Sequence, residues 1–172
     1  MSAAPKLSLA VQYASTGICP ERAQVRRWVR AALAIASPDV PSRRAGARLV
    51  VRFVDRAEGR ALNRQFRGRD YPTNVLTFPY EDAALFCADI VLCVPVIDAE
   101  ARAAHSSARR HAAHLVVHGV LHALGFAHDR AHDAAVMENL EVRILARFGL
   151  GDPYAAPEPV PKLARRSRHG ND

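Results

Sequence analysis

The sequence lacks the marks of a disulfide-stabilised or membrane-spanning protein. It has only three cysteines, and no two of them form a CxxC pair. An odd number of scattered cysteines predicts reduced thiols, as in cytoplasmic proteins, rather than a disulfide framework. No apolar run approaches the ~18 residues that a membrane-spanning helix needs. The first fifteen residues carry one lysine and a broken apolar stretch, which is a poor match to a signal peptide. We therefore expect a soluble, cytoplasmic protein with no membrane partner.

The composition is that of an ordinary globular domain with an uneven positive charge. The 172 residues are 49% hydrophobic and 24% charged, enough for one domain with a real core. The whole chain has a net charge of +7, whereas residues 20–69 hold thirteen arginines against four acids, a balance of +9. Such a positive field attracts polyanions, above all nucleic acid. The alternative is that the arginines only cover an ordinary solvated surface.

The pattern of apolar residues predicts a single α+β domain. Strands are expected where residues alternate or β-branched residues dominate, and helices where apolar residues recur every three or four positions. The predicted strands are 6–13, 47–54, 74–79 and 88–94, and the predicted helices are about 20–36, 56–66, 95–123 with a break near 106–107, and 131–148. This order predicts a small sheet with helices packed on it. Residues 1–150 would form the domain, and the proline-containing, basic residues 151–172 a flexible tail.

Three histidines near the end of the long helical region have the spacing of a metal site. On a helix, His118 and His122 lie on the same face with Cβ atoms ~6 Å apart, so both imidazoles can bind one tetrahedral ion. Gly125 can adopt the left-handed conformation that ends the helix and returns the chain. That return would bring His128 to the ion as a third ligand. The pattern H-x3-H-x2-G-x2-H is the long zinc signature of metzincin proteases.

The number of ligands favours a catalytic zinc. Three protein ligands leave a fourth position open for water, whereas structural zinc sites use four. Zinc peptidases place a glutamate, the general base, directly after the first histidine, but here that residue is Gly119. Phosphodiester cleavage depends less on such a base, because a metal and a cation can stabilise the charge that develops on phosphorus. Three unrelated histidines are the alternative, although unpaired imidazoles in an apolar helix would be costly.

A fourth histidine, His114, lies one turn before His118. Four residues advance a helix by ~40° beyond a full turn, which leaves His114 ~80° from His122. One ion shared by residues 114, 118 and 122 would therefore have strained geometry. We interpret His114 as a neighbour of the metal site rather than a ligand.

Beyond the histidines, the chain resembles the YbeY family of bacterial metal-dependent endoribonucleases over about residues 47–154. The matching segments are LNRQFRGRDYPTNVLTFPY (62–80), ADIVLC (88–93), HLVVHGVLHALGFAHD (114–129) and MENLEVRILARFGL (137–150). The chain departs from the family pattern at Ala88, Ala123 and Ala127, where the family has glycine, leucine and aspartate. None of these three is a ligand, but Ala127 removes a carboxylate that could have supported one.

The resemblance implies a zincin-like core, with a small mixed sheet beside the metal-bearing helix. It implies one zinc per chain held by His118, His122 and His128, and a functional role for Arg67 in the FRGRD segment. The implied activity is cleavage of single-stranded RNA in 16S rRNA 3′-end maturation and ribosome quality control, with the small ribosomal subunit as partner and no DNA specificity. Two alternatives remain: a zinc metallopeptidase-like hydrolase, disfavoured by Gly119, and a non-catalytic ribosome-assembly factor with a structural metal, disfavoured by the three-ligand count.

Overall fold

The computed structural model describes residues 6–36, 46–126 and 130–156. Within these ranges the predicted elements are present, and the long helical region is divided in two just before Ala108. The strands are β1 (Lys6–Tyr13), β2 (Gly46–Val54), β3 (Val75–Tyr80) and β4 (Leu85–Cys93), and the helices are α1 (Arg22–Ala36), α2 (Arg56–Arg67), α3 (Val94–Ala103), α4 (Ala108–Ala123) and α5 (Ala131–Ala146). The expected break near 106–107 is confirmed, because the Ser107 side chain accepts a hydrogen bond from the Arg110 backbone and caps α4.

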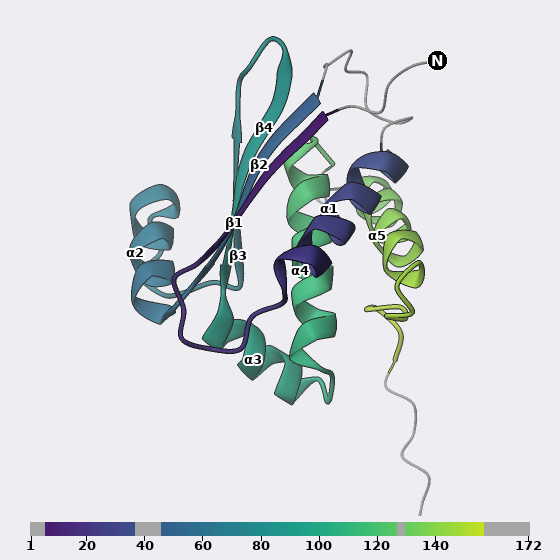
Figure 1. Cartoon of the computed structure of the whole chain (residues 1–172). Coiled ribbons are helices and arrows are strands. Elements are labelled where there is room, and N and C mark those ends of the chain that lie inside the picture. Colours follow the sequence, from purple (N-terminus) through teal and green to yellow (C-terminus); the bar gives the residue numbers. More distant parts are fainter. Residues whose placement is uncertain (1–5, 37–45, 127–129, 157–172) are drawn as a thin grey trace, which may run out of the picture.

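The four strands form the mixed sheet that was expected. Their order is β1-β2-β4-β3, in which β1, β2 and β4 are parallel and β3 is antiparallel to β4. In Figure 1 the sheet separates α2 from α1, α4 and α5, while α3 lies at the end of the sheet where β4 finishes. The chain is therefore a single α+β domain, with α4 on one face of the sheet and β3 at its edge.

Helix α4 is the centre of the packing. It contacts β3, β4, α1, α3 and α5. Its apolar side chains are almost wholly buried, among them Val116, Val117, Val120 and Leu121. Burying each such aliphatic side chain contributes about 1.5–3 kcal/mol, so the backbone of α4 is held firmly against the sheet. Side chains on the remaining face of α4 are consequently presented from a rigid element.

Cys19, Cys87 and Cys93 are all free thiols, and the last two are buried in strand β4. In the described ranges, no helix has the length and apolar character required to cross a bilayer.

The C-terminal part of the chain is described as far as residue 156. Residues 151–156 follow α5, and Tyr154 among them contacts α4 and α5 through hydrogen bonds. The rest of the expected tail, residues 157–172, lies outside the described residues. The division into a domain of residues 1–150 and a flexible tail stays a prediction.

Candidate metal centre

Three histidines at four-residue spacing line one side of α4. The ring centroids of His114 and His118 are 6.2 Å apart, and those of His118 and His122 are also 6.2 Å apart. His114 and His118 are partly buried, whereas His122 is exposed near the end of the helix. One nitrogen from each of His118 and His122 can reach a shared ion at the ~2.0–2.1 Å typical of zinc. The spacing read from the sequence therefore does place two predicted ligands side by side.

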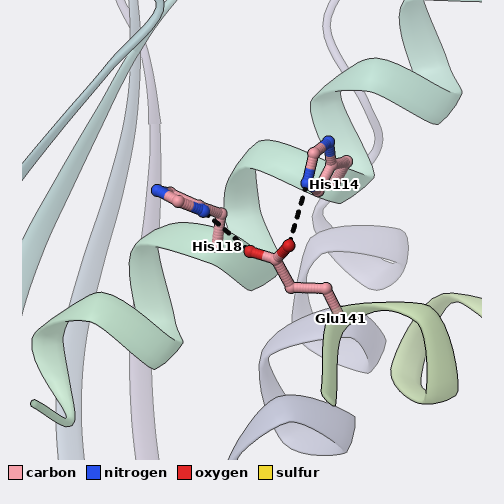
Figure 2. A group of neighbouring side chains, drawn as sticks. All are labelled: His114, His118 and Glu141. Atoms are coloured by element: carbon pink, nitrogen blue, oxygen red, sulfur yellow. Dashed lines mark hydrogen bonds and ion pairs between the residues drawn. The ribbon is translucent and has the colours of Figure 1, made fainter. Parts of the chain in front are cut away.

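A buried carboxylate from α5 contacts two of these rings. Figure 2 shows Glu141 reaching from α5 to His114 and His118 on α4. Its Oε1 lies 2.7 Å from Nδ1 of His118, and its Oε2 lies 3.2 Å from Nε2 of His114. The side chain of Glu141 is 0% exposed. A charge taken out of water at this depth is stable only when it is paired and hydrogen-bonded.

Tyr154 completes the hydrogen bonding of Glu141. The phenol donates to Oε2 of Glu141 and lies 3.2 Å from Nε2 of His114. Burial alone would raise the pKa of Glu141, but the hydrogen bonds from His114, His118 and Tyr154 outweigh burial and lower it to about 2. Burial and the bond to Glu141 raise the pKa of Tyr154. At neutral pH the carboxylate is therefore ionised and the phenol protonated.

The donor set fits a divalent ion in two ways. Ligand atoms of His114, His118 and Glu141 all lie within 4.8 Å of one another, so this cluster could hold a metal. The other arrangement is the predicted one, with His118 and His122 joined by His128. His128 lies outside the described residues, as do its neighbours 127 and 129. The structure therefore places two of the three predicted ligands.

Gly125 ends α4 as expected. Its φ of +98° lies in the region that side chains disfavour, and no atom would contact a Cβ there. The backbone N–H of Gly125 bonds to the carbonyl of His122, and that of Phe126 bonds to the carbonyl of Leu121. The helix thus ends at Ala123, one residue after His122.

Gly119 faces the sheet and not the histidines. A Cβ built on this residue would lie 2.7 Å from Cγ2 of Ile90 and 3.3 Å from Oγ1 of Thr77. Both neighbours are buried side chains of β4 and β3. The position where zinc peptidases have their glutamate base is therefore filled by the sheet in this chain, and a carboxylate there would have no room.

Replacing Gly119 by alanine should lower the free energy of unfolding. A Cβ 2.7 Å from Cγ2 of Ile90 forces buried side chains to shift, so the cost should lie toward the upper part of the ~1–3 kcal/mol range for overpacking. That cost exceeds the preference of about 1 kcal/mol for alanine over glycine in a helix. Urea unfolding measures the change. Ile90→Ala removes the opposing Cγ2, so the double variant should be less destabilised than the sum of the two single variants. Additive losses would show that this close approach does not limit the position.

Arg67 belongs to α2, which lies on the opposite face of the sheet from α4 (Figure 1). It is the last residue of α2, a helix that Asp55 caps by accepting a hydrogen bond from the backbone of Glu58. Gly68 follows with φ +69° and turns the chain. The Arg67 side chain is exposed, and its Nη2 donates to the backbone carbonyl of Thr77 at 3.3 Å. Thr77 also packs against Gly119 of α4. Arg67 and α4 therefore contact the same residue of the edge strand.

Two residues of the site had no assigned role in the sequence. Glu141 follows Leu140 on a helix whose buried side includes Met137 and Ile144. A carboxylate three or four positions from such residues falls on the buried face, and this signal was readable. Tyr154 gave no comparable signal, because it follows the last helix in a segment without periodicity.

Comparison with known proteins identifies the family that this chain resembles. A family model described as Endoribonuclease YbeY matches residues 11–149. Endoribonuclease YbeY of Bordetella pertussis (strain Tohama I) is 52% identical over 155 residues, covering 89% of this chain and 99% of its own. Endoribonuclease YbeY of Alkalilimnicola ehrlichii is 51% identical over 164 residues, covering 90% of this chain and 95% of its own.

A solved structure supports the fold alone. The solution structure of TM1509 from Thermotoga maritima superposes with a TM-score of 0.55 at 20% sequence identity, covering 88% of this chain and 97% of that one. The sequence matches extend from β1 to the turn after α5 and include the whole of α4. With half of its residues shared along nearly the full length of these relatives, the chain belongs to the YbeY endoribonuclease family.

Proposed function

We propose that this protein is a metal-dependent endoribonuclease that cleaves single-stranded RNA, with one zinc held by His118, His122 and His128. The observation that carries the proposal is the pair of imidazoles one turn apart on α4, backed by the buried carboxylate of Glu141. The name Endoribonuclease YbeY, which its relatives carry, supports RNA as the substrate.

The residues have separate roles in this proposal. When bound, zinc would act as a Lewis acid and lower the pKa of its water toward ~7. His118 and His122 would hold the ion from α4, a helix fixed by its packing on the sheet. Arg67 presents a planar guanidinium that can bond two oxygens of one phosphate and neutralise charge that develops there. The hydrogen bond from Arg67 to Thr77 keeps that guanidinium beside β3.

A peptidase is the less favoured alternative. Gly119 leaves no room for the usual glutamate base, because a side chain there would collide with Ile90. A non-catalytic assembly factor is disfavoured by the count of three histidine ligands, since structural zinc sites use four. We further propose, from the family, 16S rRNA 3′-end maturation and ribosome quality control in the cytoplasm. The small ribosomal subunit would be the partner, with no DNA specificity.

Cleavage of two substrate classes separates these functions. Purified protein is incubated with a single-stranded RNA and, separately, with casein, each with and without a metal chelator. The proposal expects cleavage of RNA alone and its loss with chelator. Cleavage of casein would support the peptidase, and a zinc-loaded protein that cuts neither substrate would support the assembly factor.

RNA affinity should fall steeply as salt rises. Residues 20–69 carry a charge balance of +9, and the counterions released when arginines neutralise phosphates make binding salt-dependent. Arg26 and Arg30 lie one turn apart on α1, and Arg30 is exposed. Charge reversal at both should weaken binding and reduce the salt slope without changing zinc content. Fluorescence anisotropy at several salt concentrations measures this. An affinity that does not change with salt would mean that the arginines are incidental.

A further inference from the structure

We infer that Glu141 and Tyr154 are positioning residues for the metal ligand His118 and do not bind the metal themselves. The inference rests on the metal site of the proposed function and extends it to the chain beyond α5. It also decides between the two arrangements that the donor set allows. In one, the ion lies inside the cluster of His114, His118 and Glu141. In the other, Glu141 and His114 lie on one side of the His118 ring and the ion lies on the opposite side.

The hydrogen bonds of Glu141 favour the second arrangement. An ionised carboxylate can only accept hydrogen bonds, so Nδ1 of His118, 2.7 Å from Oε1, carries a proton. A nitrogen that carries a proton cannot bind a metal, and Nε2 then becomes the ligand atom of His118. Figure 2 shows this second nitrogen on the side of the ring away from Glu141. The carboxylate therefore fixes both the tautomer and the direction of His118.

The same reasoning accounts for His114. The phenol of Tyr154 donates to Oε2 of Glu141, and Nε2 of His114 lies 3.2 Å from each of these two oxygens. Nε2 of His114 therefore donates, and it points into the network. An ion inside the cluster would have to displace these bonds around a carboxylate that is fully buried. The geometry makes His114 a further support of Glu141.

Tyr154 is itself held in place by Asp152 of its own segment and by two residues of α4. Its backbone N–H bonds to the side chain of Asp152 at 2.8 Å, and the carbonyl of Asp152 accepts from the Arg110 guanidinium at 2.8 Å. Arg110 lies in the first turn of α4, two turns before His118. The ring of Tyr154 packs edge-on against His114 with centroids 5.4 Å apart. The segment after α5 thus fastens the start of α4 to the carboxylate that orients the metal ligand.

The test is the zinc affinity of metal-stripped protein, measured by competition with a chromogenic chelator and without RNA. Tyr154→Phe keeps the ring packing and removes the donor to Glu141. We expect it to weaken zinc binding by ~10-fold, and Glu141→Gln by ~10–100-fold, the range found for groups that orient metal ligands. Both variants should still bind one zinc. Tyr80→Phe is the matched control, since the Tyr80 phenol also donates to a carboxylate, Asp89, outside the histidine cluster, and it should bind as the parent does.

Nitrogen-15 NMR of His118 supplies a readout that a loss of stability alone would not change. The zinc-bound parent should show a protonated Nδ1 and a metal-bound Nε2, and the share of this tautomer in the apoprotein should fall in Tyr154→Phe and Glu141→Gln. His114→Ala should retain one zinc.

Unchanged affinity in Tyr154→Phe would overturn the role of the phenol. Loss of stoichiometric zinc in both His114→Ala and Glu141→Gln would instead place the ion inside the cluster. A parent that binds no zinc would overturn the inference together with the metal assignment. If the parent binds zinc but does not cleave RNA, the proposed function fails while this inference stands.

Discussion

Replacing His122 by alanine should remove zinc from the protein. The parent should carry about one zinc per chain, as a three-histidine site does, and the variant close to none. His122 is exposed at the end of α4, so its loss creates no buried cavity and should cost the apoprotein little stability. Zinc should therefore raise the melting temperature of the parent and leave that of the variant unchanged, because only a ligand that binds the folded state stabilises it.

The control for this experiment is His105→Asn. His105 lies between α3 and α4 with φ +51°, a backbone conformation that asparagine tolerates well. This variant removes an imidazole outside the predicted ligand set and should retain full zinc content. Elemental analysis after gel filtration gives the stoichiometry for all three proteins. Stoichiometric zinc in His122→Ala would contradict the ligand assignment. It would instead favour a metal site formed by His114, His118 and Glu141.

Arg67→Lys should separate RNA cleavage from RNA binding. Lysine keeps the positive charge but loses the planar fork with which arginine bonds two phosphate oxygens. If that fork stabilises the transition state, single-turnover cleavage with saturating enzyme should slow by ~10²-fold, the scale of one lost donor to a developing charge. Binding of the RNA should stay close to that of the parent, since electrostatic attraction depends mainly on charge.

Two neighbouring arginines provide the controls. Arg64 and Arg69 are also exposed near the end of α2, and Arg69 donates to the phenol of Tyr71. Lysine at either position should change neither cleavage nor binding by much. Zinc content is measured for every variant, so that a slower rate is not caused by lost metal. Equal cleavage rates for Arg67→Lys and the parent would remove Arg67 from the mechanism.

Local features of the fold were predictable because they depend on neighbours in the sequence. The Asp55 cap of α2, the cap at Ser107 and the left-handed Gly125 each concern a few consecutive residues. The spacing of His118 and His122 needs only the geometry of one helix. Sheet order was not predictable in this way, because the antiparallel placement of β3 at the edge depends on contacts between distant segments.

The burial of Glu141 was readable from its position on α5, but its contact with the histidines of the candidate metal site was not, for the same reason. Glu141 lies 23 residues after His118, and Tyr154 lies 40 residues after His114. Only the packing of α5 on α4 brings them together. Gly119 shows a related limit of the sequence. The sequence shows that the glutamate base of zinc peptidases is absent, but only the structure shows that Ile90 of the sheet leaves no room for a side chain at this position.

The most direct test of the proposed function is RNA cleavage by one preparation of the protein in three states. The states are zinc-loaded, stripped by chelator, and stripped then reloaded with one equivalent of zinc. We expect a single-stranded RNA to be cut by the first and third and left intact by the second, with no recovery on reloading His122→Ala. Cleavage at the parent rate by stripped protein containing no measurable zinc would contradict a metal-dependent endoribonuclease.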